Sequence, residues 1–115
     1  MHDIIKKDIL AVLNGLVEIL KFKEESDIVQ IKELSNHVVH NASVFQDEDS
    51  ISVAILIYSL SKIMERKQKD LDYGKVLNML NFCILNLKNN NDELFRKSIK
   101  NIFDFIRTID EKLKL

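Results

Sequence analysis

Apolar and polar residues along this chain repeat with the period of an α-helix, in segments separated by short polar stretches. Over residues 3–23, apolar positions recur every three or four residues and form one broad stripe, as in an amphipathic helix. Similar stripes run through residues 26–46, through a helix capped by Asp70 or Asp72 that ends at 88, and through residues 92–112. The pattern therefore predicts an amphipathic helix over each of these four ranges.

The segment 50–69 has a different pattern. Its part Ile51–Leu60 is apolar at nearly every angle around a helix axis, and only Ser52, Ser59, Lys62 and Arg66 form a thin polar strip. Helices that are apolar all round are normally buried ones. We therefore expect this third helix to lie at the centre of the fold, wrapped by the amphipathic helices.

The connecting segments are short, which favours antiparallel neighbours, and the chain has no proline and only two glycines. One glycine, Gly15, lies inside the first predicted helix, where it would allow close approach of a neighbouring helix. Asn90 and Glu93 have the spacing of a capping box before the last helix. The prediction is a single all-α domain over residues 1–115, a compact antiparallel bundle of about five helices with the third helix central and buried.

The single cysteine, Cys83, lies within an apolar run and cannot form an internal disulfide. We expect it to be a small buried hydrophobic residue in a protein of a reducing compartment. The first residues carry acids where a secretory signal has bases, and no apolar run approaches the ~20 residues of a membrane helix. The expectation is a cytoplasmic protein with no membrane partner.

Charge is distributed unevenly, although the formal net charge is only −1. Residues 24–50 hold seven acids and one lysine, whereas residues 62–115 hold twelve Lys or Arg and eight acids. This asymmetry is compatible with a charged partner or with head-to-tail self-contact. A near-neutral total disfavours non-specific nucleic-acid binding. One alternative function is nevertheless a helical subunit of a nucleic-acid complex that uses the basic 96–107 face, formed by Arg96, Lys97, Lys100 and Arg107.

One pair of histidines has a spacing that suits chemistry. His37 and His40 would lie on neighbouring positions of a helix and could share a divalent metal ion with Asp47 or Asp49, or act as an acid–base couple. This gives a second alternative, a small metal-dependent or acid–base enzyme centred on the histidines and the acids 47–49. Zinc motifs with paired histidines place a glutamate between them, whereas valines occupy that gap here. No catalytic residue is assigned, and no cofactor is expected apart from such a metal.

The sequence favours association over catalysis. Two predicted helices, 50–69 and 72–88, present more apolar perimeter than a bundle of this size readily hides, and such patches usually mark a partner. The residues expected to bind a partner are Met79, Phe82, Phe103 and Phe105. The main prediction is a non-catalytic interaction or regulatory module that binds a protein partner or itself, as a homodimer.

Overall fold

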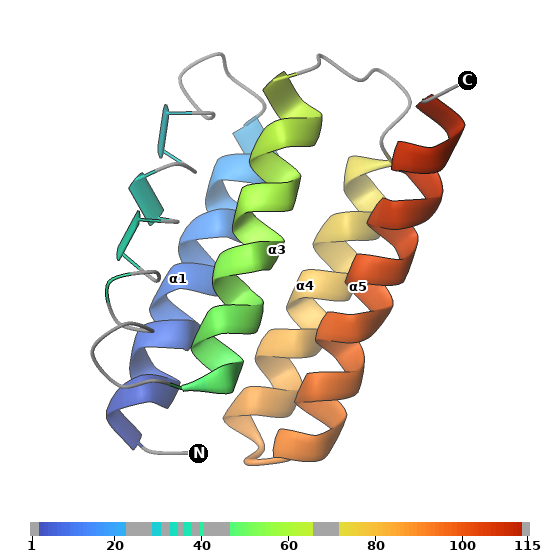
Figure 1. The fold of residues 1–115 in the computed structure, drawn as a ribbon. Helices are drawn as coiled ribbons and strands as arrows, with labels where there is room; N and C mark the ends of the chain where they lie inside the picture. The colour runs from blue at the N-terminus through green and yellow to red at the C-terminus, as the bar shows by residue number, and fades with distance from the viewer. Residues whose placement is uncertain are drawn as a thin grey trace.

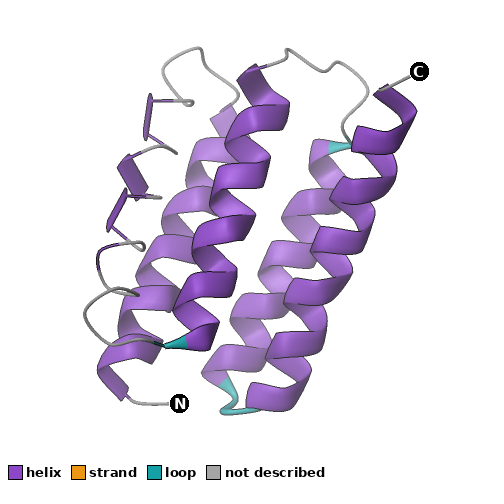
Figure 2. Ribbon diagram, viewed as in Figure 1, coloured by secondary structure: helices purple, strands orange, loops and turns teal. Residues whose placement is uncertain are grey.

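The described part of the chain forms four long helices, α1 (Asp3–Phe22), α3 (Glu48–Glu65), α4 (Tyr73–Lys88) and α5 (Asp92–Leu113) (Figure 1). The computed structural model describes residues 3–22, 29–30, 33–34, 36–37, 40, 47–65 and 72–113. Within these residues every regular element is helical and none is a strand (Figure 2). The prediction of an all-α protein is confirmed.

The helix predicted over residues 26–46 falls largely outside the described residues. Those that the structure does describe in this range, at 29–30, 33–34, 36–37 and 40, are helical. Leu34 is the nearest neighbour to Gly15 of α1, since its methyl groups would lie 3.6 and 3.7 Å from a Cβ placed on that glycine. A count of five helices stays a prediction.

The four described helices form a ring in which each contacts two others. Helix α4 packs against α1 and α5, and α3 packs against α5 and α1. In Figure 1, α1, α3 and α5 run in one direction and α4 runs in the opposite direction. The contacts α1·α4 and α4·α5 are therefore antiparallel, whereas α3·α5 and α1·α3 are parallel. The prediction that neighbouring helices are antiparallel is therefore wrong for these two contacts. Helices α3 and α5, for example, run in the same direction because α4 lies between them in the sequence, and they pack side by side.

Each helix contributes one apolar stripe to a common core. The largest fully buried side chains are those of Phe95, Ile9, Leu13, Leu16, Leu20, Leu56, Ile57, Leu60, Leu80, Leu87 and Ile102. They come from all four helices, so the core lies between them. Burial of one such side chain stabilises the fold by roughly 1.5–3 kcal/mol, so the core is what holds the ring together.

The prediction that the third helix is central and buried on all sides is wrong. Its inner face, which includes Leu56 and Leu60, is fully buried, but Ile51, Ile55 and Tyr58 are exposed. The reason is geometric, because α3 has only two helical neighbours among the described elements and its outer side is left without one. Neither α3 nor any other helix in the described residues is long and apolar enough to cross a membrane.

Short polar side chains fix where the helices begin. The Asp47 carboxylate accepts hydrogen bonds from the backbone N–H and the hydroxyl of Ser50, at 2.9 and 3.1 Å, so α3 begins at Glu48. Asp72 caps α4 in the same manner by accepting a 2.9 Å hydrogen bond from the N–H of Lys75. These caps satisfy backbone donors that have no partner inside the helix.

The turn between α4 and α5 ends one helix and begins the next within very few residues. Asn90 has a φ of 59°, in the left-handed region, and the N–H of Asn91 donates to the Asn86 carbonyl at 3.0 Å. The Asn91 side chain then accepts from the N–H of Leu94 at 3.2 Å. The predicted capping role of Asn90 is therefore wrong, because Asn90 forms the turn and Asn91 caps α5.

Candidate functional site

The most unusual surface of the described residues lies on the outer side of α3. Ile51, Ile55 and Tyr58 are 44, 51 and 54% exposed, although each is a large apolar side chain. They follow one another at intervals of four and three residues, and Glu48 and Lys62 extend the series by three and four residues at its ends. We call these five residues the α3 face. Steps that alternate between three and four residues are those of a helix seam that packs against another helix.

The two charged ends of the α3 face have opposite signs. Glu48 lies in the first turn of α3 and Lys62 in its last turn, where each charge is favourable to the helix dipole. The Glu48 side chain makes no hydrogen bond or ion pair with any described residue. The Lys62 ammonium lies 4.9 Å from the centroid of the Tyr58 ring. The face is thus an apolar centre with a free carboxylate at one end and an ammonium at the other.

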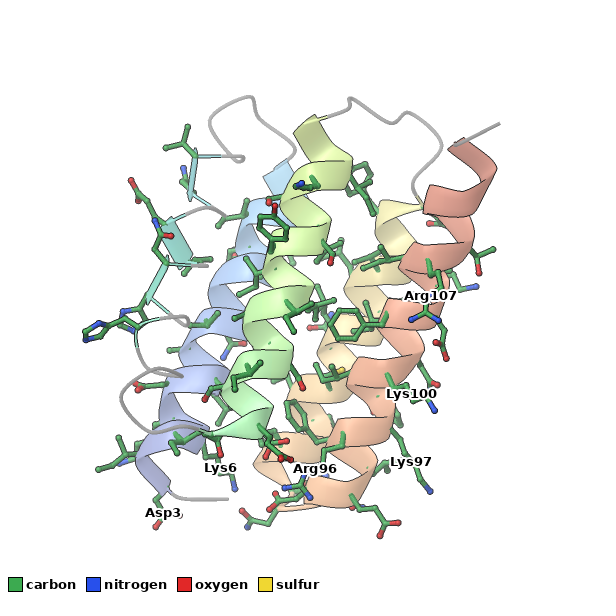
Figure 3. The ribbon with its side chains drawn as sticks, viewed as in Figure 1. Asp3, Lys6, Arg96, Lys97, Lys100 and Arg107 are labelled. Atoms are coloured by element: carbon green, nitrogen blue, oxygen red, sulfur yellow. The ribbon has the colours of Figure 1, made fainter. Side chains whose placement is uncertain are left out.

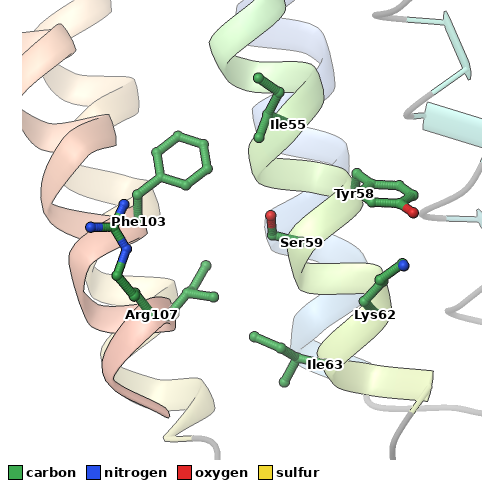
Figure 4. A pocket seen from close by; sticks show the side chains of 8 residues that line it. Ile55, Tyr58, Ser59, Lys62, Ile63, Phe103 and Arg107 are labelled. Atoms are coloured by element: carbon green, nitrogen blue, oxygen red, sulfur yellow. The ribbon is translucent and has the colours of Figure 1, made fainter. Parts of the chain in front are cut away.

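A cleft of about 280 Å³ opens between α3 and α5, next to the α3 face (Figure 4). It is lined by Ile55, Tyr58, Ser59, Lys62, Ile63, Phe103, Ile106 and Arg107. In Figure 4 the Phe103 and Arg107 side chains lie on the α5 wall, opposite Ser59 and Ile63 of α3. The cleft therefore lies between α3 and α5, and its apolar walls are continuous with the α3 face.

The chemistry of the cleft suits binding. Two of its lining residues, Lys62 and Arg107, are cationic, and Arg107 makes no hydrogen bond or ion pair with the described residues. The described lining contains no carboxylate, imidazole or thiol. An apolar group could fill the walls while an anionic group meets one of the two cations. The cleft is therefore chemically suited to an amphiphilic group.

The four aromatic and methionine residues predicted to bind a partner lie on α4 and α5. Met79, Phe103 and Phe105 are partly buried against the core, and the Lys75 ammonium lies 4.5 Å from the Phe105 ring centroid. Phe82 is exposed on α4. Only Phe103 among these four lines the cleft. The largest exposed apolar series is instead the α3 face, which the sequence prediction missed.

The histidines and acids of the metal prediction have separate surroundings. His37 and His40 are both exposed. Asp47 caps α3, and Asp49 is buried and bound to Arg96. The part of the chain that the structure describes contains no cluster of three or more His, Cys, Asp or Glu side chains that could hold a metal ion.

Asp49 and Arg96 join the beginnings of α3 and α5. The guanidinium donates from Nε to Oδ1 at 2.9 Å and from Nη2 to Oδ2 at 3.0 Å, which is a bidentate pair. The hydrogen bonds and the negative charge of Asp49 raise the pKa of Arg96 further above its usual value. The Asp49 side chain is 10% exposed and that of Arg96 is 55% exposed. This pair joins the first turn of α3 to the second turn of α5, although the two residues are 47 positions apart in the sequence.

The pair also changes the basic 96–107 face. Figure 3 shows Arg96, Lys97, Lys100 and Arg107 along α5. Arg96 is occupied by Asp49, and the Lys97 ammonium lies 3.9 Å from the carboxylate of Glu93. Two of the four cations therefore already have acidic partners within the described residues.

Cys83 belongs to a buried polar cluster between α4 and α5. The Ser98 hydroxyl donates to the Leu94 carbonyl at 2.7 Å and accepts from the side-chain N–H of Asn86 at 2.9 Å. Cys83 is fully buried, as predicted. Burial raises the pKa of its thiol from 9.0 to about 12, and hydrogen bonds to Ser98 and to the Cys83 backbone lower this pKa by less than burial raises it. A thiol in this state is a poor nucleophile at neutral pH.

Comparison with known proteins gives no relative of this chain. No protein-family model, no curated protein and no solved structure matches it. A function for the chain has to follow from its own surface.

Proposed function

We propose that this protein is a cytoplasmic, non-catalytic interaction module that binds a helical surface of a protein partner, with a second copy of itself as the simplest case. The α3 face is the docking surface. The single observation that carries the proposal is the exposure of Ile51, Ile55 and Tyr58 at helical-seam spacing on one side of α3.

Single exposed apolar residues are ordinary on protein surfaces and need no function. Three in one row are different, because together they form a strip on which another amphipathic helix can lie. The adjacent cleft provides a place where a side chain of that helix can insert between Ile63 and Phe103. Flanking charges at Glu48 and Lys62 would fix the direction in which the helix lies.

The size of this surface predicts a weak interaction. Each of the three apolar side chains already has about half of its surface buried, so covering the rest would stabilise a complex by roughly 1–1.5 kcal/mol per side chain. With an equal contribution from the partner the total is roughly 6–9 kcal/mol, and the loss of rigid-body freedom, about 4–15 kcal/mol, offsets most of it. We therefore expect a dissociation constant of about 0.2 mM or above.

A photo-cross-linking amino acid placed on the α3 face tests the proposal inside cells. Tyr58→p-benzoylphenylalanine should give a discrete adduct on irradiation, because position 58 would lie inside the interface. The matched control is Leu85→p-benzoylphenylalanine, since Leu85 is also an exposed apolar residue but lies on α4. Adducts that are absent at position 58, or equally abundant at both positions, would contradict the proposal.

The other two sequence-based alternatives remain testable predictions. Metal analysis after purification without chelators should find about one ion per chain if His37 and His40 bind one. Retention on heparin that falls steeply with salt would favour a nucleic-acid role for the basic 96–107 face.

A further inference from the structure

We infer that the occupant of the α3 face is a second copy of this chain, with the two α3 helices packed antiparallel about a two-fold axis that passes beside Ile55. The inference rests on the proposed function, and it specifies both the partner and the register. It is carried by the order of the residues along the α3 face, which is self-complementary in one direction only.

The register follows from the sequence positions. Glu48 lies seven residues before Ile55, and Lys62 lies seven residues after it, which is about 10.5 Å along the helix on either side. A two-fold axis through Ile55 therefore brings each Glu48 level with Lys62 of the second copy. Because a two-fold axis repeats every contact, the dimer contains two such carboxylate–ammonium pairs.

The apolar contacts fall into the same register. Ile51 is four residues before the axis and Tyr58 is three residues after it. In the antiparallel pair, Ile51 of one copy therefore lies beside Tyr58 of the other, while the two Ile55 side chains meet at the centre. All three exposed apolar side chains of each copy are covered by the same three residues of the other.

A parallel arrangement of the two α3 helices would have the opposite electrostatics. It would place Glu48 beside Glu48 and Lys62 beside Lys62, so both ends of the interface would bring like charges together. The charges of the α3 face thus select the antiparallel direction. This selection is what distinguishes a self-complementary surface from a general apolar strip.

The positive end of the face is formed by Lys62. Figure 4 shows the Lys62 side chain pointing away from the α5 wall of the cleft, toward the open side of α3, where the carboxylate of Glu48 from the second copy would meet it. The Glu48 side chain makes no competing hydrogen bond or ion pair with a described residue of its own copy, so its charge is available for the contact.

Cysteine cross-linking tests the register directly. Ile55→Cys places a thiol beside the two-fold axis, so mild oxidation should produce a disulfide-linked dimer. Leu85→Cys is the matched control, because Leu85 is 52% exposed and Ile55 is 51% exposed. The native Cys83 is fully buried and does not interfere. Cross-linking at position 55 should be at least about tenfold faster than at position 85. Equal rates, or no cross-linking at position 55, would overturn the register.

Charge exchange tests the same register without a covalent bond. Lys62→Glu should weaken the dimer about tenfold or more, because two attractive pairs become repulsive. The double variant Glu48→Lys/Lys62→Glu should restore the dissociation constant to within about threefold of the original. The control Glu93→Lys/Lys97→Glu exchanges an exposed pair on α5 and should leave the constant unchanged. Failure of the double exchange to restore the dimer would overturn the inference.

Sedimentation velocity over micromolar to millimolar concentrations gives the dissociation constants, and circular dichroism confirms that each variant folds. A chain that remains monomeric throughout this range overturns the second-copy inference. The proposed function fails by a different result, namely the absence of a position-specific adduct in cells. A heteromeric adduct at position 58 together with a monomeric purified chain would retain the docking surface and exclude self-association.

Discussion

The bidentate pair between Asp49 and Arg96 offers a direct test of how this bundle is held together. Arg96→Ala removes both donors and leaves the Asp49 carboxylate, which is 10% exposed, without its side-chain partner. The neighbouring variant Lys97→Ala removes a cation whose carboxylate partner is 3.9 Å away, with both side chains exposed. The two variants lie on the same helix, one residue apart, and differ mainly in the burial of the acid that they leave behind.

The expected magnitudes differ accordingly. A buried acceptor that loses its partner destabilises a protein by about 1–3 kcal/mol, and by more when it is charged. Asp49 lies in the first turn of α3, where the helix dipole offsets part of this loss by about 0.3–1 kcal/mol. We therefore expect Arg96→Ala to lower the free energy of unfolding by about 2 kcal/mol. An exposed pair such as that of Lys97 contributes about 0–1 kcal/mol.

Urea denaturation followed by circular dichroism measures both values, and thermal unfolding provides a second measurement. For a domain of this size, about 2 kcal/mol corresponds to a fall in Tm of roughly 6–12 °C. The double variant Asp49→Ala/Arg96→Ala should lose less stability than the sum of the single variants, because removing the carboxylate removes the unpaired buried charge. Arg96→Lys should be intermediate, since an ammonium cannot form the two-pronged contact.

Equal effects of Arg96→Ala and Lys97→Ala would refute the stabilising role of the Asp49–Arg96 pair. Strict additivity in the double variant would also refute this role, because the interaction would then contribute nothing that depends on both residues.

Three further outcomes follow from the described residues. Gly15→Ala should raise the free energy of unfolding by up to about 1 kcal/mol in urea denaturation, because a Cβ there would be in ordinary contact with Leu34 and alanine favours the helix; a loss of stability would contradict this. In the monomer, Ile57→Ala should lower the free energy of unfolding by about 2–5 kcal/mol and Ile55→Ala by under about 1 kcal/mol, because only Ile57 is fully buried. Similar losses for the two variants in urea denaturation would refute the assigned orientation of α3. Cys83 should resist thiol reagents at pH 8 until the protein unfolds, and rapid labelling of the folded protein would contradict its burial. Because burial raises the pKa of this thiol from 9.0 to about 12, its contribution to stability should fall as pH rises above 9.0. The free energies of unfolding of the native chain and of Cys83→Ala, compared across this pH range, measure that fall.

The helices themselves could be predicted from the sequence because their signals are local. The apolar stripes predicted the extents of α1 and α5 to within about one residue, as 3–23 and 92–112, and of the two caps considered for α4 the structure has Asp72. The predicted burial of Cys83 within its apolar run is also confirmed. These features depend on helical periodicity, which can be seen within a short stretch of consecutive residues.

The arrangement of the helices depends on contacts between residues that are far apart in the sequence. An apolar pattern on every side of Ile51–Leu60 does not reveal which side will lack a neighbour, and this is why the exposed α3 face was not predicted. Asp49 and Arg96 are 47 residues apart, so no spacing rule connects them. The regular three-and-four steps from Glu48 to Lys62 were the available signal, but the apolar residues between those steps obscured it.

The tight turn at Asn89–Asn91 has a consequence for the order in which the chain assembles. It joins two helices whose polar contact, from Asn86 to Ser98, closes a loop of only 12 residues, whereas the contact from Asp49 to Arg96 closes one of 47. Chain entropy opposes the longer closure more strongly, so we expect the α4–α5 hairpin to form first and to serve as the template onto which the N-terminal half condenses. Changes at Ser98 should then slow refolding, while changes at Arg96 should mainly accelerate unfolding.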